Sequence, residues 1–372
     1  MFDGRVQSCC QAAEDAPSLD EIKSHPVGFF NYQQIVNDRS DMLNGEKISG
    51  CQTCWDDEDR GLVSRRNKYG SSVFIDNVDQ CVPTTLTISL SNTCAMTCVY
   101  CCKKYSHSWR ADVINNGPYD YAVDDRYTAT NKDQLFHVLS QSQTQQTKFY
   151  HAILDQLIKI SKSVDKVSIM GGEPFLSNNL IEILEVFDYT STNITIITGL
   201  GVAGSRLEKI IKHIAKFKNL TISISAESIG DHYEFIRYGN TFDNFNNNIK
   251  ILQNNGISIK YGSTVNNLSI FSFLEFFDTY VDKSQCNLTV DLVSTPFFLS
   301  PHVLDNTSKQ QFLNRCDQYS QYFDVDNLKK SLASSPSDTD RMACKTFLTE
   351  FSKRRNLSLD IFPKSFVSWL TK

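Results

Sequence analysis

The chain has 372 residues, of which 41% are apolar and 21% are charged. Such a composition predicts a globular protein that buries a substantial core, in one large domain or in two to three smaller ones. The formal net charge of -5 argues against a surface that binds nucleic acid along its whole extent, so a nucleic-acid partner is not expected. No apolar run is long enough to span a bilayer. The first 15 residues lack a basic-then-apolar signal layout, and together these features predict a cytoplasmic protein with no membrane partner.

The predicted elements fall into three regions in chain order. Residues 1–80 are rich in cysteine, turns and charge and form a predicted N-terminal cysteine-rich region. In residues 81–293, short apolar runs of strand type alternate with stretches of helical period. In residues 294–372 the strand pattern fades and helices dominate. A polar, turn-rich stretch at 108–146 interrupts the middle region and is expected to be an insertion.

The middle region contains six predicted strands with helices between them. The predicted strands are residues 84–90, 166–170, 193–198, 220–225, 257–265 and 287–293, and the predicted helices are residues 149–164, 178–189, 204–217, 241–255 and 270–281. Strands that alternate with helices predict parallel β/α units with right-handed crossovers. Six units are fewer than the eight of a closed barrel, which leaves a partial barrel or an open sheet. In either fold, the chemistry is expected at the carboxyl ends of the strands.

Twelve cysteines are unusual for a protein of this kind. In a reducing compartment structural disulfides are not expected, so clustered cysteines indicate metal binding or catalysis. Three isolated residues, Cys286, Cys316 and Cys344, fit the alternative that they are small buried apolar side chains. The two dense groups of cysteines do not fit that alternative.

The denser group lies in the stretch NTCAMTCVYCCKKY, residues 92–105, directly after the first predicted strand. Cys94, Cys98 and Cys101 are spaced so that a short loop can direct all three sulfurs at one centre. Thiolates at this density select zinc or an iron–sulfur cluster. Three ligands leave one position open, whereas structural zinc takes a closed set of four. Cys102 is an alternative fourth ligand, although its side chain more naturally points away from the centre as a buried thiol.

Two motifs together resemble the radical S-adenosylmethionine (radical SAM) superfamily. The first is C-x3-C-x2-C after the opening strand, with the aromatic Tyr100 before the last cysteine. The second is Gly171-Gly172-Glu173 at the end of the next strand, where that superfamily carries a motif that meets the amino group of S-adenosylmethionine (SAM). A tight turn is the alternative interpretation of the second motif taken alone.

The resemblance implies an α/β fold with a partial (β/α)6 barrel of the TIM type. It also implies a [4Fe–4S] cluster held by Cys94, Cys98 and Cys101, with SAM on the open iron and with Tyr100 and the GGE residues at the cofactor. Reductive cleavage of SAM would give a 5′-deoxyadenosyl radical that abstracts a hydrogen atom from the substrate.

Further cofactor candidates follow from the same resemblance. Ser225, Glu227 and Arg237 stand where relatives carry residues for the ribose or the carboxylate of SAM, although Glu227 replaces the commoner Asp. Thr198, Ser263 and Asn266 are weaker candidates, since ordinary polar residues at strand ends would look the same.

The second cysteine group consists of Cys9, Cys10, Cys51 and Cys54. Their spacing, with the run from residue 39 to residue 66, resembles the auxiliary-cluster modules of radical SAM enzymes, the SPASM and twitch type. Those modules usually follow the barrel, and here the pattern precedes it. The resemblance implies an auxiliary iron–sulfur cluster, whose fourth ligand stays open between one of the Cys9–Cys10 pair, Cys81, a C-terminal cysteine and the substrate. Structural zinc on the same four thiols is the alternative.

The leading functional hypothesis is therefore a radical SAM enzyme that modifies a ribosomally made peptide and receives its electron from a flavodoxin- or ferredoxin-type donor. Modification of a small metabolite or of a tRNA nucleoside is an alternative within the enzyme class. A non-catalytic zinc-binding interaction protein is the alternative from another class. The short basic runs at 64–68 and 352–356 are expected to be solvated surface.

Overall fold

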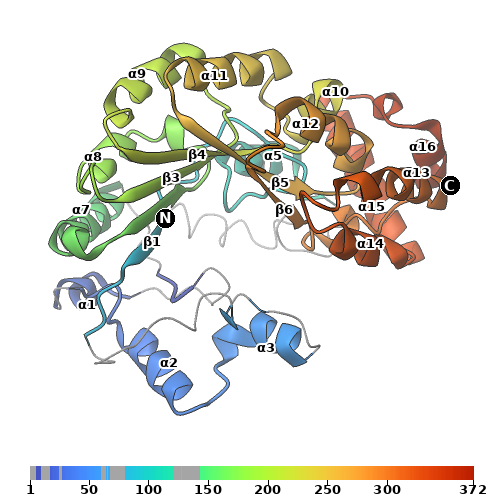
Figure 1. The fold of residues 1–372 in the computed structure, drawn as a ribbon. Coiled ribbons are helices and arrows are strands. Elements are labelled where there is room, and N and C mark those ends of the chain that lie inside the picture. The colour runs from blue at the N-terminus through green and yellow to red at the C-terminus, as the bar shows by residue number, and fades with distance from the viewer. Residues whose placement is uncertain are drawn as a thin grey trace. The chain divides into compact units, whose positions relative to one another are not determined.

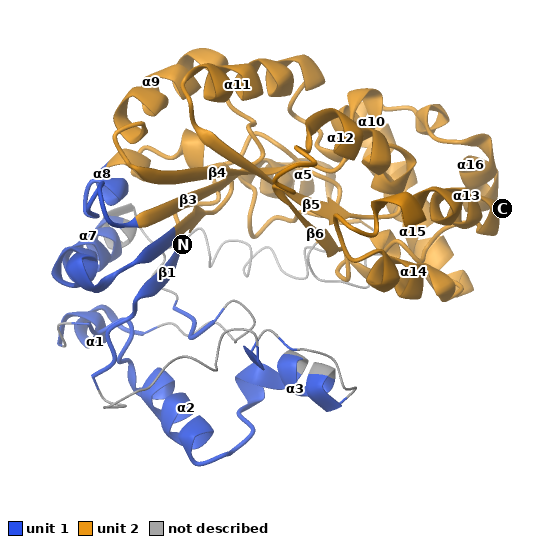
Figure 2. Ribbon diagram, viewed as in Figure 1, with its two compact units in different colours: residues 1–87, 137–167, 182–192 blue, residues 88–136, 168–181, 193–372 orange. Residues whose placement is uncertain are grey.

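The computed structural model describes residues 6–9, 17–24, 27–59, 64, 66–67, 80–119, 127 and 143–372. The chain forms two compact units, which Figure 2 shows in two colours. Unit 1 contains Met1–Thr87, His137–Val167 and Glu182–Thr192, and unit 2 contains Ile88–Phe136, Ser168–Ile181 and Asn193–Lys372. The predicted division of the sequence at residues 80 and 293 stays a prediction.

Six strands form one sheet whose spatial order β1-β2-β3-β4-β5-β6 is also the order in the chain. The strands are β1 (Thr85–Ser89), β2 (Lys166–Met170), β3 (Asn193–Thr198), β4 (Asn219–Ser225), β5 (Ser258–Val265) and β6 (Leu288–Leu292). The register pairs β3 with β4, β4 with β5 and β5 with β6 in parallel. Because β1 and β6 are not neighbours, the sheet does not close. The predicted α/β fold, with six strands in a partial barrel, is confirmed.

Helices connect the strands and continue beyond the last one (Figure 1). In unit 1 and at its boundary they are α1 (Leu19–Ser24), α2 (Gln33–Leu43), α3 (Gln52–Asp59), α7 (Gln143–Ile160) and α8 (Leu180–Leu184). In unit 2 they are α5 (His107–Asn116), α9 (Gly204–Ile214), α10 (Gly230–Ile236), α11 (Phe242–Asn254), α12 (Phe273–Tyr280), α13 (Asn306–Cys316), α14 (Val325–Ala333), α15 (Asp338–Arg355) and α16 (Lys364–Thr371). The last four form the predicted helical C-terminal region. No helix among the described residues combines the length and apolar character that crossing a membrane requires.

The two faces of the sheet differ in chemistry most clearly in β4, where apolar and hydroxyl residues alternate. Ile194 and Ile196 of β3 are buried, and so are Leu220, Ile222 and Ile224 of β4. Helices α9 and α11 lie over one face of these strands (Figure 1). The buried residues of α9 recur with helical spacing, as an amphipathic helix on a sheet requires, and they are Leu207, Ile210, Ile211 and Ile214. The opposite face of β4 carries half-buried hydroxyl side chains, and that of β3 carries the half-buried Thr195 and Ile197.

Two predicted segments differ from the structure. The stretch predicted as a turn-rich insertion from residue 108 begins with helix α5, because Ser106 caps the helix and Trp109 and Val113 bury one side of it. The helix predicted at 178–189 is only the five-residue α8. After the helix, the Asp188 carboxylate accepts the backbone N–H groups of Thr190 and Ser191 in the turn that leads to β3.

Candidate functional site

The cysteine loop after β1 places its three predicted ligands together in unit 2. Cys94 and Cys98 are 6% and 7% exposed and pack around Met96, with Cys101 beside them. Burial raises the pKa of Cys94 to about 12 and that of Cys98 to about 11, and it raises the pKa of Cys101 well above its usual value. Binding of a metal cluster at these sulfurs must therefore displace protons. Cys102 is 4% exposed, as expected for a buried thiol.

The start of α5 holds one side of this loop. The ring of His107 accepts the Cys94 N–H at its Nδ1 atom, 2.9 Å away. Three neighbouring side chains donate to carbonyl oxygens of the loop: Ser106 Oγ to Met96 at 2.7 Å, Ser108 Oγ to Cys94 at 2.8 Å and Trp109 Nε1 to Cys98 at 2.9 Å. The backbone of an irregular loop needs such partners when it is buried, and the sequence Ser-His-Ser-Trp supplies them.

The segment after α10 holds the other side of the loop. Thr97 N donates to the Tyr238 carbonyl oxygen at 2.7 Å, and Val99 N donates to the Ile236 carbonyl oxygen at 2.9 Å. Gly239 has a φ of +103°, and a Cβ atom there would lie 2.6 Å from the Ala95 carbonyl oxygen. Only glycine permits this approach of the two backbones.

The Gly-Gly-Glu segment at the end of β2 packs directly against the start of the cysteine loop. Gly172 N donates to the Ser91 carbonyl oxygen and Glu173 N to the Thr93 carbonyl oxygen, both at 2.7 Å. A Cβ atom on Gly171 would lie 2.6 Å from Ser91 O, and one on Gly172 would lie 2.5 Å from Thr93 O. The two motifs found in the sequence therefore form one continuous site, and the glycines are required by close backbone contact.

The Glu173 side chain turns toward the loop after β3. Its carboxylate is 1% exposed and accepts hydrogen bonds from Thr198 Oγ1 at 2.7 Å, Gly199 N at 3.1 Å, Gly201 N at 3.3 Å and Phe175 N at 3.2 Å. Burial raises the pKa of Glu173, and these hydrogen bonds oppose the rise. Thr198, a weak candidate from the sequence, is thus a partner of Glu173, and no sequence signal had linked the two residues.

Tyr100, Glu227 and Arg237, three further predicted cofactor residues, lie together in the same unit. Arg237 and Glu227 form an ion pair at 2.6 Å, with side chains 4% and 0% exposed. The Tyr100 hydroxyl lies 3.2 Å from both oxygens of Glu227. Burial alone would lower the pKa of Arg237, but the Glu227 carboxylate and its other neighbours raise it well above its usual value. Within the described part of the chain, Arg237 Nε is buried without a hydrogen-bond partner.

The remaining strand-end candidates have different surroundings. Ser225 is half-buried at the end of β4. Ser263 Oγ donates to the Ala226 carbonyl oxygen at 2.6 Å, and Asn266 Oδ1 accepts from the N–H groups of the turn that follows it. The side chains of Ser263 and Asn266 therefore form hydrogen bonds with the backbone, as ordinary polar residues at strand ends do.

Unit 1 brings together part of the second cysteine group. Cys51 and Cys54 are buried, and Cys9 is exposed. Burial raises the pKa of Cys51, and the charges of Cys9 and Cys54 raise it further. Cys10 lies outside the described residues. The Trp55 ring packs on Cys51 and lies 4.1 Å from the Arg66 guanidinium carbon.

Across the described residues, no three Cys, His, Asp or Glu side chains already stand in a metal-ligand arrangement. The assignment of ligands in both cysteine groups therefore stays a prediction. The chemistry of the donor set fits iron–sulfur binding in unit 2, since the buried thiols of Cys94 and Cys98 and the half-buried thiol of Cys101 share one loop.

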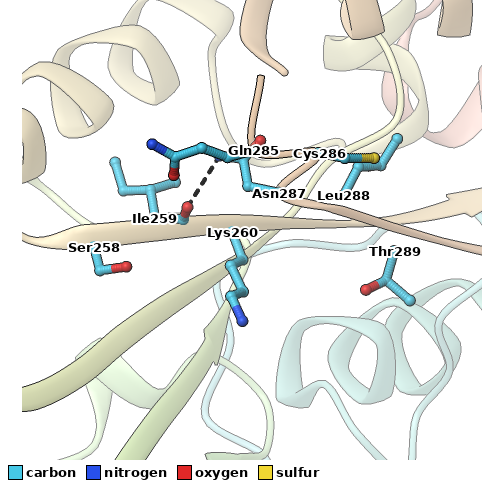
Figure 3. Close-up of a pocket in the computed structure, with 8 residues that line it drawn as sticks. All are labelled: Ser258, Ile259, Lys260, Gln285, Cys286, Asn287, Leu288 and Thr289. Atoms are coloured by element: carbon cyan, nitrogen blue, oxygen red, sulfur yellow. Dashed lines mark hydrogen bonds between the residues drawn. The ribbon is translucent and has the colours of Figure 1, made fainter. Parts of the chain in front are cut away.

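A cavity of about 230 Å³ lies at the amino ends of β5 and β6. Figure 3 shows Lys260 and Thr289 extending to the same side of the sheet there. Because the chemistry of parallel β/α folds lies at the carboxyl ends of the strands, this cavity is not the candidate active site.

Among the isolated cysteines, Cys316 and Cys344 are fully buried, and Cys286 is half-buried.

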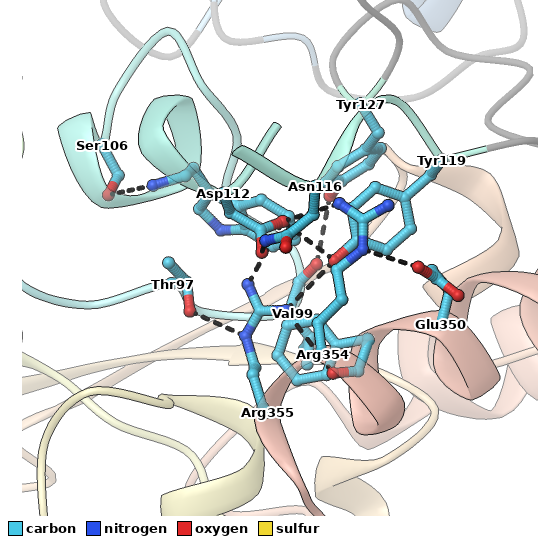
Figure 4. Close-up of polar contacts among 12 residues, drawn as sticks. Thr97, Val99, Ser106, Asp112, Asn116, Tyr119, Tyr127, Glu350, Arg354 and Arg355 are labelled. Carbon is cyan, nitrogen blue, oxygen red and sulfur yellow. Dashed lines mark hydrogen bonds and ion pairs between the residues drawn. The ribbon is translucent and has the colours of Figure 1, made fainter. Parts of the chain in front are cut away.

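The basic run at 352–356 is not solvated surface. The side chains of Arg354 and Arg355 are only 5% and 4% exposed, so the expectation from the sequence is wrong for them. Asp112 and a group of aromatic rings surround both guanidinium groups (Figure 4). These partners are far away in the sequence, which is why the local charge pattern was misleading.

Comparison with known proteins gives one family match. Residues 88–271 match the family model of the radical SAM superfamily, and no curated protein matches. Solved structures with a similar fold include native anSMEcpe with bound AdoMet (14% identity, 66% of this chain and 63% of that chain, TM-score 0.38). Streptococcus suis SuiB is another (17% identity, 66% of this chain and 53% of that chain, TM-score 0.34). In these two matches the chain covers less than two thirds of the other protein.

Proposed function

Since residues 88–271 form a radical SAM domain, we propose that this protein is an enzyme that cleaves SAM reductively at a [4Fe–4S] cluster held by Cys94, Cys98 and Cys101. When bound, the cluster and SAM supply one-electron chemistry: cleavage of the sulfonium to a 5′-deoxyadenosyl radical that takes a hydrogen atom from the substrate. A flavodoxin- or ferredoxin-type protein is the proposed electron donor.

One observation carries this proposal. The loop with the three cysteines and the Gly-Gly-Glu segment are joined backbone to backbone through Gly172 and Glu173. The loop thus has three sulfurs on one short stretch, and the Glu173 carboxylate of the neighbouring segment is 1% exposed. A carboxylate that is removed from water in this way interacts more strongly with a charged cofactor.

Tyr100, Glu227 and Arg237 have a distinct role in the proposal. Glu227 neutralises Arg237 and accepts from Tyr100, so it orients a cation and an aromatic ring. Arg237 Nε is a buried donor without a partner in the described residues, and an anionic group such as the SAM carboxylate would satisfy it. Ser225 is the proposed hydroxyl partner for the ribose or the carboxylate.

The test of the proposal is SAM cleavage in cysteine variants. Replacement of Cys94, Cys98 and Cys101 together by Ala should abolish formation of 5′-deoxyadenosine under dithionite. Cys286→Ala, a half-buried cysteine outside both groups, is the matched control and should retain cleavage. If the triple variant still cleaves SAM, the assignment of the cluster loop is wrong.

We further propose an auxiliary iron–sulfur cluster in unit 1, held by Cys51, Cys54 and one or both of Cys9 and Cys10. The burial of both Cys51 and Cys54, which lie three residues apart, supports it. Anaerobically reconstituted protein should then contain about eight irons per chain, and about four would remove the auxiliary cluster. Replacement of Cys51 and Cys54 by Ala should largely spare SAM cleavage but stop turnover of the substrate. Colourless protein with stoichiometric zinc would instead favour the zinc-binding alternative.

A ribosomally made peptide is the proposed substrate, on the resemblance of the N-terminal cysteine pattern to auxiliary-cluster modules. A short peptide encoded beside the gene should stimulate release of 5′-deoxyadenosine, and the mass of that peptide should change during the reaction. Strongly salt-dependent binding of tRNA would favour the nucleoside alternative instead.

A further inference from the structure

The last residue of α15, Arg355, reaches the cysteine loop from a distant part of the same unit. Its Nε atom donates to Thr97 Oγ1 at 3.0 Å, and Figure 4 shows the two side chains facing each other. Thr97 directly precedes Cys98 in the loop. Arg355 lies outside residues 88–271, which match the family model.

The guanidinium of Arg355 is buried and contacts a carboxylate, a hydroxyl and aromatic rings. It is 4% exposed and lies 3.7 Å from a carboxylate oxygen of Asp112, and its Nη1 donates to the Tyr119 hydroxyl at 3.1 Å. Its central carbon lies 3.9 Å from the centre of the Phe351 ring and 4.8 Å from that of Trp109. Burial of a cation is unfavourable unless it is paired and hydrogen-bonded, and here both conditions are met.

The same cluster of side chains binds the next two residues of the loop. Trp109 Nε1 donates to the Cys98 carbonyl oxygen at 2.9 Å, and the Tyr127 hydroxyl donates to the Val99 carbonyl oxygen at 3.1 Å. The Trp109 and Tyr127 rings are in edge contact, with centroids 5.2 Å apart. Three consecutive residues, 97 to 99, are therefore held by one packed group that includes Arg355.

Neighbouring Arg354 also pairs with Asp112, the carboxylate that lies beside Arg355. It pairs with Asp112 at 3.2 Å and lies over the Tyr119 ring at 4.0 Å. Asp112 is thus shared by two arginines, and its position in α5 is fixed from α15.

We propose that Arg355 is a positioning residue for the iron–sulfur site. By fixing Thr97, it holds the backbone of the loop between Cys94 and Cys98 in place before a cluster binds. The loop therefore loses less conformational entropy when the cluster binds. The proposal rests on the proposed role of the cysteine loop. The planar, stacked guanidinium suits this role and a lysine does not, because lysine has no fork of donors and no flat face.

The test compares three variants of the whole chain, and a fourth, Arg355→Lys, is added for the second measurement. Arg355→Gln removes the charge and the stacked group, and Thr97→Val removes the acceptor hydroxyl but keeps the side-chain shape. Lys353→Gln is the matched control, since its side chain is 78% exposed on the same helix. Thr97→Val also keeps the test informative if Arg355→Gln does not fold.

The first measurement is amide hydrogen exchange in the cluster-free protein. The Thr97 and Val99 amides should exchange about tenfold faster or more in Arg355→Gln, as for loss of a hydrogen bond to a charged group. Thr97→Val should accelerate the same amides, and Lys353→Gln should not. Amides of β4 should keep their protection in every variant. If β4 loses protection equally, or if Thr97→Val leaves the loop amides unchanged, Arg355 supports the fold in general and the proposal is overturned.

The second measurement is the electron paramagnetic resonance spectrum of the reduced cluster after reconstitution. Arg355→Gln and Thr97→Val should broaden or shift the signal. Arg355→Lys should show the same change as Arg355→Gln, whereas the spectrum of Lys353→Gln should match that of the unmodified protein. Identical spectra in all variants would overturn the proposal. If the unmodified protein forms no cluster but the exchange results hold, the proposed function fails and the positioning of the loop by Arg355 stands.

Discussion

The buried pair of Glu227 and Arg237 predicts a large loss of stability when one charge is removed. Glu227→Gln keeps the size of the side chain but leaves the Arg237 cation, 3% exposed, without a countercharge. Removal of one partner from a buried ion pair destabilises a protein by about 3–5 kcal/mol, because an uncompensated charge stays in a medium of low dielectric. The Tyr100 hydroxyl still finds an amide oxygen, so the loss comes from the charge.

The control is a pair at the surface. Asp317 and Lys329 form an ion pair with side chains 71% and 39% exposed, and pairs of this kind contribute less than about 1 kcal/mol. Urea unfolding followed by tryptophan fluorescence gives the free energy of unfolding of each variant. Glu227→Gln should lower it by several times as much as Asp317→Asn does.

A double variant separates charge from packing. Glu227→Leu combined with Arg237→Met removes both charges, and the stability should recover by a large part of the loss in Glu227→Gln. If Glu227→Gln costs no more than Asp317→Asn, the pair does not lie in a dry interior. If the double variant is less stable than Glu227→Gln, packing around the pair dominates over its charge.

Two smaller predictions concern backbone and pH. Gly239→Ala should destabilise the protein more than Gly256→Ala in the same urea assay. Both glycines have positive φ, but of the two only Gly239 has backbone atoms within 3 Å of an added Cβ. Equal losses of unfolding free energy would contradict the close approach of Gly239 to the cysteine loop. Hydrogen bonds from Thr190, and backbone N–H groups of the same turn, lower the pKa of Asp188 to about 2, below its unfolded value near 4. Its stabilisation is therefore present above pH 4 and is lost as the pH falls toward 2, so the difference in stability between the natural protein and Asp188→Asn should narrow over that range. A difference that stays constant from pH 6 to pH 3 would show that the carboxylate charge is not responsible.

The sheet was predictable because its signal is local. Apolar and hydroxyl residues alternate within β4, β3 is a short apolar run, and the helix between them has a clear apolar side, so the sequence alone predicts strands, helices and the parallel order. Helix α5 was missed because only Trp109 and Val113 are buried on it, too few to mark a period. Arg354 and Arg355 were misread because charge is a local property of the sequence, whereas Asp112 and Tyr119 are contributed by a segment more than 200 residues earlier.

The candidate site shows the same division between local and distant causes. The spacing of Cys94, Cys98 and Cys101 predicts which atoms can bind a metal, but a loop without regular structure cannot satisfy its own backbone. Here its N–H and carbonyl groups find partners on α5 and on the segment after α10, and its Thr97 side chain binds Arg355 of α15. A chain could therefore keep all three cysteines and lose the arrangement of the loop through one change at Arg355. The motif identifies the donors, and the surrounding fold determines whether they are held in place for a cluster.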